Sequence, residues 1–307
     1  MAVATLVGGP YEDFWHNRDG EVVTSADALW DMLSKHDENG EIIQTSTSGN
    51  NHFTQHDNGL AKGHQYTTIG VTDLVPGKRL VKVRNPWGSE QYKGAWCDAC
   101  AEWDDVSEDI KNELNFAKAD DGIFYITVED YQTAFESTEV NYDISTDEWI
   151  GDYYLFLNDN STGDADSGFC DGCTKHEFTL TNTYQDVQRV FIAIHTWEDR
   201  GYAYDDKECD FKWNYAMFSS DQGQWFNFGG RHQIIVEMQP NEVITGTVEL
   251  NWPDDQSQDW SVTTWAKGGK VQVALTSMPS RPSDSLVGYY AGEAPESSYE
   301  PVPVPEG

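Results

Sequence analysis

Two residues with the chemistry of proton transfer stand in the most specific motifs of the sequence. His64 lies in a Gly-His-Gln-Tyr motif at residues 63–66, and Asn85 lies in an Arg-Asn-Pro-Trp-Gly motif at residues 84–88. An imidazole takes and gives a proton near neutral pH, and the carbonyl of an asparagine side chain can orient it. Such a pair supplies the base of a nucleophilic site, while the nucleophile itself must come from another residue.

An antiparallel hairpin is the element expected to bring these two residues together. Alternating runs at residues 64–71 and 79–84 flank a turn signal at residues 76–77. A turn centred near residue 74 or 75 places position 64 opposite position 85. His64 and Asn85 are therefore predicted to lie side by side at the open end of the hairpin.

The rest of the first half predicts a mixed α and β region. Ser25 is a candidate N-cap for a helix that ends near Gly40, and a strand with a long polar loop is expected over residues 41–62. A helix from Ser107 to about Lys118, a strand at residues 122–128 and a small helix at residues 129–135 follow.

From about residue 147 the pattern changes to successive β-type runs separated by polar or Gly-containing turns. Short strands without a convincing helix between them predict an antiparallel sandwich. The runs are residues 153–157, 177–181, 187–197, 233–238, 245–252, 260–266 and 270–277. After residue 280 the chain is rich in Ser, Glu and Pro, which predicts a disordered tail.

The balance of charge is strongly acidic, with 53 Asp and Glu against 19 Lys and Arg and a net charge of −34. This field repels phosphate backbones and anionic lipid surfaces, so nucleic-acid and membrane partners are not expected. Basic protein faces and divalent cations are the partners it favours, and a solvated acidic surface is the competing explanation. No stretch is apolar enough for a membrane span and no signal peptide is recognised, so we expect a cytoplasmic protein.

Five cysteines, of which four form two Cys-x-x-Cys pairs, leave several chemistries open. An odd number without a signal peptide does not predict a disulfide framework. Cys97, Cys100, Cys170 and Cys173 have the local spacing of zinc knuckles, although the pairs lie on either side of the predicted domain boundary. Zinc binding, a redox pair and reduced surface thiols are the three alternatives.

The motifs around His64 and Asn85 resemble the second protease-core subdomain of calpains. That family has Gly-His-Ala-Tyr, then Arg-Asn-Pro-Trp-Gly, then Gly-x-Trp-Ser-Asp, to which residues 94–98 correspond as Gly-Ala-Trp-Cys-Asp. Residues 120–126 and 128–131 resemble two further family segments. The resemblance covers residues 1 to about 145, and extends to residues 146–280 as the family's β-sandwich.

The resemblance implies an α+β protein in two domains and a tail. Residues 1–145 are expected to form half of a papain-like calpain core, an antiparallel sheet with flanking helices. Residues 146–280 are expected to form an all-β calpain-type, C2-like sandwich, and residues 281–307 the disordered tail. Carried over residue by residue, His64 becomes the base, Asn85 its orienter and Trp87 the shield of their hydrogen bond.

The same resemblance raises two doubts about activity. No cysteine precedes His64 and none is followed by Trp, so the nucleophile of the family is absent from the sequence. The calpain calcium site is matched in part: Asp98 and Asp121 are kept as weak calcium candidates, while Gln91 and Ile123 stand where acids are expected. Calcium takes six to eight oxygen ligands, so such losses weaken a site.

The expected function is therefore a calpain-like protein that is inactive by itself and acts as a structural or docking subunit in a protein assembly, with a possible association with the cytoskeleton. The alternative is the His/Asn half of a split, calcium-dependent cysteine endopeptidase whose Cys half is on another chain. A calcium- or zinc-responsive adaptor overlaps the first expectation. The Cys-bearing half or a large assembly is the expected partner.

Overall fold

The computed structural model describes residues 9–18, 21–89, 92–143, 149–160, 174–196, 215–220, 223–228, 231–251, 257–267 and 272–275. The chain divides into two compact units, Met1–Asp147 and Glu148–Gly307. Within the described residues, no helix combines the length and the apolar character that crossing a membrane requires.

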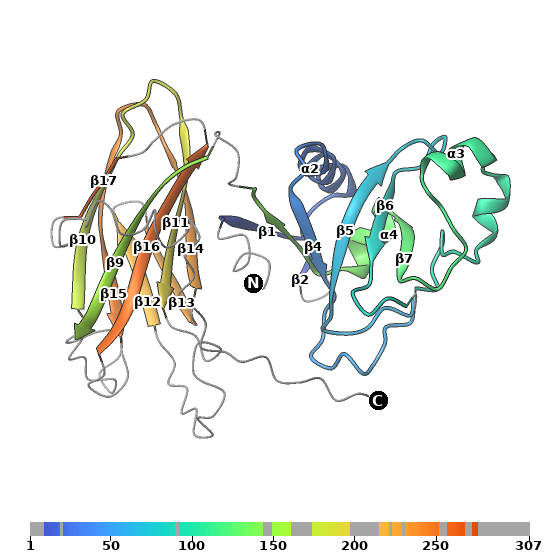
Figure 1. The fold of residues 1–307 in the computed structure, drawn as a ribbon, viewed down its shortest axis with the longest axis horizontal. Coiled ribbons are helices and arrows are strands. Elements are labelled where there is room, and N and C mark those ends of the chain that lie inside the picture. Colours follow the sequence, from blue (N-terminus) through green and yellow to red (C-terminus); the bar gives the residue numbers. More distant parts are fainter. Residues whose placement is uncertain are drawn as a thin grey trace, which may run out of the picture. The chain divides into compact units, whose positions relative to one another are not determined.

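A six-stranded antiparallel sheet forms the frame of the first unit (Figure 1). Its strands, in spatial order, are β1 (Tyr11–Trp15), β8 (Ser137–Asn141), β4 (Ile42–Ser46), β5 (Gln65–Thr72), β6 (Leu80–Arg84) and β7 (Ile123–Thr127). A short two-stranded ribbon, β2 (Asn17–Arg18) and β3 (Glu21–Val22), follows β1. The β5–β6 hairpin carries the motifs of the candidate site.

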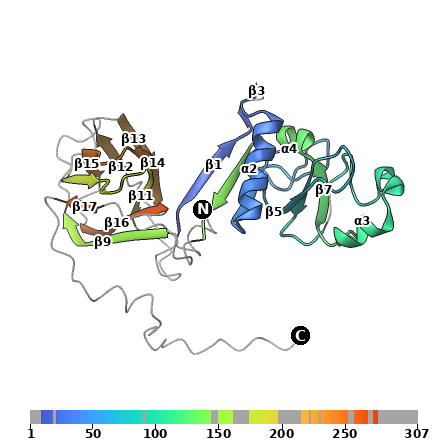
Figure 2. The same ribbon diagram turned by 90° about the horizontal axis from the view of Figure 1, so that it is seen from above.

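Two helices cover one face of this sheet, as Figure 2 shows from above. Helix α2 (Ala26–Glu38) begins at Ser25, whose side chain accepts a hydrogen bond from the backbone of Ala28, and buries its apolar stripe. Helix α4 (Val128–Ala134) begins in the same way at Thr127, whose side chain accepts from the backbone of Asp130. Both caps satisfy backbone N–H groups that the first turn of a helix leaves without partners.

The opposite face is covered by the segment that follows the site motifs, including η1 (Ala101–Asp105) and α3 (Glu108–Glu113). A hydrophobic cluster forms on this face, and we call it the η1 cluster. Its members are Val75, Leu80, Trp96, Trp103, Val106, Leu114 and Tyr125. Side chains alternate between the faces of a strand, so β6 and β7 contribute to both sides of the sheet. The sheet is therefore held rigid from both faces.

The described part of the second unit contains nine antiparallel strands in two sheets. One sheet has the order β13 (Gly223–Phe228), β12 (Tyr215–Ser220), β15 (Val243–Asn251), β10 (Thr174–Thr181) and β17 (Gln272–Leu275); the other has β14 (Arg231–Met238), β11 (Gln188–Thr196), β16 (Ser257–Lys267) and β9 (Trp149–Asn160). One hydrophobic cluster takes residues from both sheets, among them Phe178 of β10 and Ile192 of β11. The unit is thus a two-sheet sandwich.

The mixed, sheet-rich character expected of the first half is present, with three corrections in detail. The first-unit strands β1, β2, β3 and β8 and the second-unit strands β12 and β13 were not predicted. Helix α3 ends at Glu113, because Asn115 adopts a left-handed conformation at φ 51°. The hairpin pairs Thr67 with Arg84, so its register differs by two residues from the predicted pairing of positions 64 and 85.

Candidate active site

His64 is fixed at the start of β5 by reciprocal hydrogen bonds with Thr47. The backbone N–H of His64 donates to Thr47 Oγ1 at 3.0 Å, and the N–H of Thr47 donates to the carbonyl of His64 at 3.0 Å. The hydroxyl of the buried Thr47 in turn donates to the carbonyl of Ala61 at 2.6 Å. The loop between β4 and β5 is thereby held against the residue that carries the imidazole.

Asn85 is almost completely buried, and each polar group of its side chain has a partner. Its Oδ1 accepts from the backbone N–H of Trp87 at 3.1 Å, and its Nδ2 donates to the carbonyl of Ser89 at 3.1 Å. Its own N–H donates to the carbonyl of Gly122 at 2.7 Å. These contacts fix which end of the side-chain amide is oxygen, because only an oxygen can accept from the N–H of Trp87.

The two side chains meet, with 3.0 Å between His64 Nε2 and Asn85 Oδ1. Since Asn85 Oδ1 can only accept, Nε2 carries the proton and donates it in this hydrogen bond. Nδ1 is then the nitrogen of the neutral ring that can accept a proton. Among the described residues, Nδ1 has no hydrogen-bond partner, so it is available to an incoming group.

Aromatic rings enclose the imidazole on two sides. The Trp87 ring lies 4.2 Å from the His64 ring, and Tyr66 contacts it edge-on at 4.8 Å. Tyr66 is buried, whereas 46% of Trp87 is exposed. On the solvent side, the ring centres of His52 and Trp87 are 6.2 Å apart, and the His52 ring lies tilted against Phe53, which is 87% exposed. The imidazole therefore packs on the buried Tyr66, and the exposed side chains of Trp87 and Phe53 form the rim of the site.

Burial is the main influence on the charge of His64 and lowers the pKa of the imidazole below its usual value. The hydrogen bond with Asn85 acts in the opposite direction, and electrostatic repulsion from the neighbouring imidazole of His52 lowers the pKa further. His64 is consequently neutral at pH 7, the state in which it can act as a base.

The contact survives the shifted register because the shift is two residues. Side chains alternate between faces, so a shift of two keeps His64 and Asn85 on the same face as diagonal neighbours. Sequence reasoning missed Ser89 and Gly122, which support the pair through backbone carbonyls, and Thr47, which supports it through its hydroxyl and its N–H. A backbone carbonyl has no signature in the sequence, although the hydroxyl of Thr47, next to the predicted strand, was a signal that could have been used.

The two halves of the zinc hypothesis have different outcomes. Cys97 and Cys100 are joined by a disulfide, and Cys170 and Cys173 lie outside the described residues. Zinc binds thiolates, which a disulfide does not provide, so Cys97 and Cys100 present no zinc ligands while they are joined. Zinc binding and reduced surface thiols stay predictions for the four cysteines.

The calcium candidates Asp98 and Asp121 line one cavity of about 20 Å³, together with Asn115 and Tyr125. Each carboxylate already accepts a backbone hydrogen bond, Asp98 from Ala119 and Asp121 from Ile123. No cluster of three or more His, Cys, Asp or Glu side chains suited to a metal occurs in the described part of the chain. Calcium takes six to eight oxygens, so ligands beyond these two carboxylates would have to come from amide or backbone carbonyls and from water.

A family model and similar curated proteins point to the same family. The family model described as calpain family cysteine protease matches residues 2–142. A calpain of Schistosoma mansoni is 41% identical over 88 residues, 27% of this chain and 12% of the relative. Human calpain-14 is 36% identical over 110 residues, 35% of this chain and 16% of the relative.

A plant relative extends the match along the chain. The calpain-type cysteine protease DEK1 of Arabidopsis thaliana is 28% identical over 142 residues, which are 45% of this chain and 6% of the relative. The matched segments thus span between 6% and 16% of the length of these three relatives. Through its first unit, in which the His64–Asn85 pair lies, this chain belongs to the calpain family.

Proposed function

We propose that the first unit is the His/Asn half of a papain-like cysteine peptidase site, inactive by itself and completed by a Cys-bearing half that these residues do not contain. The observation that carries the proposal is the His64–Asn85 hydrogen bond, which leaves Nδ1 of a neutral imidazole as the free acceptor. A general base needs an acceptor nitrogen on a neutral ring that is held in place, and this hydrogen bond provides both conditions.

Each residue has a defined part in the reaction. His64 Nδ1 takes the proton of the incoming thiol, and the thiolate attacks the carbonyl carbon of the peptide bond. The imidazolium then returns the proton to the leaving amine. Asn85 keeps the ring in place throughout, and the ring of Trp87 keeps water away from their hydrogen bond.

The rim of the site supports a protein partner. Trp87 and Phe53 are exposed, although aromatic side chains of this size are normally withdrawn from water. His52 joins them into one aromatic surface beside His64. Aromatic residues of this kind anchor protein interfaces, which favours a partner that covers the surface.

Reconstitution tests this proposal. The chain is mixed with a separately purified Cys-bearing half-core of a calpain, and cleavage of a fluorogenic peptide is followed with and without calcium. We expect neither half to cleave alone and the mixture to cleave. His64→Ala should abolish cleavage while binding persists, and Phe53→Ser should weaken binding. Cleavage by the mixture that does not need His64 would refute the assigned role.

A second candidate is a silent docking subunit, which is favoured by Gln91 and Ile123 at the positions where the family's calcium site is expected to have acids. In this alternative the aromatic rim and the second unit, which we assign as a calpain-type C2-like sandwich, are binding surfaces only. Stable association with a partner together with no cleavage by any Cys-bearing half would favour it. The protein partners and a cytoplasmic place of action belong to the proposal in both forms.

A further inference from the structure

A second reactive group lies next to the candidate site in sequence, the disulfide between Cys97 and Cys100. We propose that this disulfide is a reversible modification site that a dithiol reductant opens. We further propose that its redox state determines how well ordered residues 94–122 are, the segment that ends at Gly122, the backbone partner of Asn85. The influence on the His64–Asn85 pair rests on the proposed function, whereas the redox reaction and the response of the segment do not.

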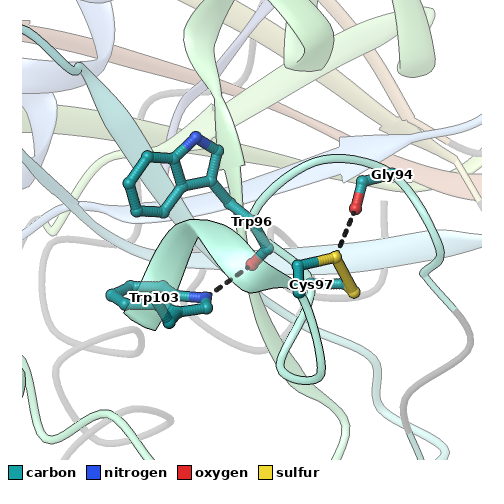
Figure 3. Close-up of a disulfide and its surroundings, with 5 residues drawn as sticks. Gly94, Trp96, Cys97 and Trp103 are labelled. Carbon is teal, nitrogen blue, oxygen red and sulfur yellow. Dashed lines mark hydrogen bonds between the residues drawn. A yellow bond between two sulfur atoms is a disulfide. The ribbon is translucent and has the colours of Figure 1, made fainter. Parts of the chain in front are cut away.

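The disulfide is accessible and sits on a well-packed support. Both cysteines are half-buried, so a reductant can approach from solvent. Figure 3 shows the disulfide beside the carbonyl group of Gly94, which lies 3.2 Å from Cys100 Sγ. The neighbouring Trp96 is buried, and the indole N–H of Trp103 donates to its carbonyl at 3.2 Å. The disulfide thus lies on a loop that packs through Trp96 and Trp103 into the η1 cluster.

The reaction is a two-electron thiol–disulfide exchange. A thiolate of the reductant attacks one of the two sulfurs, the bond between Cys97 and Cys100 breaks, and a mixed disulfide forms. The released cysteine takes a proton from solvent. The second thiolate of the reductant then attacks the mixed disulfide and closes its own disulfide. The other cysteine is released and protonated, so the reductant is oxidised and the protein reduced.

Local charge favours a regulated disulfide over a catalytic one. Asp98 lies between the cysteines, and Glu102, Asp104 and Asp105 follow directly in η1. Negative charge near a thiol disfavours the thiolate, which is the reactive form. The reduced pair is therefore a slow nucleophile. It suits a site that another dithiol modifies, and it does not suit an oxidoreductase centre.

A chain of hydrogen bonds connects this loop with Asn85. The buried Asp98 accepts from the N–H of Ala119 at 3.4 Å, and the carbonyl of Ala119 accepts from the N–H of Asp121 at 2.9 Å. The next residue, Gly122, accepts from the N–H of Asn85 at 2.7 Å. A Cβ atom at Gly122 would lie 2.9 Å from the carbonyl oxygen of Asn85, so the approach is close. Opening the disulfide releases the start of this chain.

The reaction itself is tested by alkylation mapping of the whole, folded chain in dithiothreitol redox buffers. Peptide mass spectrometry should find the Cys97–Cys100 bond in the oxidised protein, its two thiols after mild reduction, and the bond again after removal of the reductant. Cys209→Ser is the matched control and should leave this cycle unchanged. Absence of the bond, or reduction only after unfolding, would overturn the proposal.

The structural response is tested by hydrogen exchange and NMR on the same protein. Reduction should speed amide exchange over residues 94–122 about tenfold, as a locally opened segment does, and leave β4 unchanged. It should also shift the ring signal of His64. The double variant Cys97→Ser, Cys100→Ser should show the reduced pattern with or without dithiothreitol. Unchanged exchange on reduction would refute the response, irrespective of whether reconstitution gives cleavage.

Discussion

At the scale of single residues, Asn85 and His52 shift the pKa of His64 in opposite directions, so substituting each of them should change that pKa with opposite sign. Asn85→Ala removes the hydrogen bond that raises the pKa of His64, so the pKa should fall. His52→Ala removes the electrostatic repulsion from its imidazole, so the pKa should rise. A pH titration of the His64 ring signals by NMR, assigned with His64→Gln, measures both. Shifts in the same direction would contradict the assigned causes.

His16 gives a pH dependence of stability. It is fully buried, neither ring nitrogen has a partner among the described residues, and burial lowers its pKa to about 4. The unfolded chain, with a pKa of 6.5, binds the proton more readily than the folded chain. The free energy of unfolding should therefore fall as the pH drops from about 6.5 to about 4, by about 3 kcal/mol in total.

Substitution isolates this contribution from the other groups that titrate. His16→Phe keeps a ring against Tyr131, which His16 contacts at 5.3 Å, and removes the titrating group. The free energy of unfolding, measured in urea through the hydrogen exchange of β8, should depend less on pH in the variant between about pH 6.5 and about pH 4. An identical dependence in both proteins would show that His16 is protonated or accessible in the folded state.

At the scale of elements, the loop between β4 and β5 depends on a close approach of two glycines. Gly63 has φ 55°, and a Cβ there would lie 2.5 Å from the carbonyl oxygen of Gly49. Gly77, in the turn of the hairpin, has φ 72° with nothing within 4 Å. Both positions disfavour a side chain, but only Gly63 also has no space for one.

Alanine at the two glycines separates strain from crowding. Gly77→Ala should lower the free energy of unfolding by about 1 kcal/mol, the range of left-handed strain. Gly63→Ala should lower it by a further 1–3 kcal/mol, roughly the range of overpacking, and should broaden the ring signals of His64. Equal losses, measured by urea unfolding, would show that the loop moves aside without consequence.

Elements with local signals were predictable, and those that depend on distant partners were not. Ser25 and Ser107 marked the starts of α2 and α3, and the hairpin gave the His64–Asn85 contact. Strand β8 reads Ser-Thr-Glu-Val-Asn and has no apolar alternation, yet it lies between β1 and β4 with Thr138 and Asn141 buried. Its pairing partners define it as a strand, and these are not visible locally.

The hairpin register shows a second limit of sequence reasoning. The turn is centred at position 76, later than predicted, because Thr72 pairs with Leu80. The bulge between Thr68 and Gly70 adds a residue to β5 and recovers one residue of the difference. Gly70 within a strand pattern was the available signal for it. The candidate site was found because the alternation of side chains tolerates a shift of two residues, whereas a shift of one would have separated the pair.

At the scale of the whole molecule, a net charge of −34 implies that repulsion opposes folding. Raising sodium chloride from about 0.05 to about 0.5 M shortens the screening length severalfold, so the urea midpoint should rise. Potassium chloride should act equally, because screening depends on ionic strength. A rise that only calcium produces, at low ionic strength, would indicate a specific cation site instead.

The Asn85–Pro86 bond has a consequence for the chemical ageing of the protein. Asparagine loses its amide when the backbone nitrogen of the next residue attacks the side chain, and proline has no N–H with which to do so. Asn39 and Asn58 precede glycines, which hinder that attack least. Peptide mapping of protein stored at 37 °C should therefore find aspartate and isoaspartate at Asn39 and Asn58 first, while the residue that orients His64 keeps its amide.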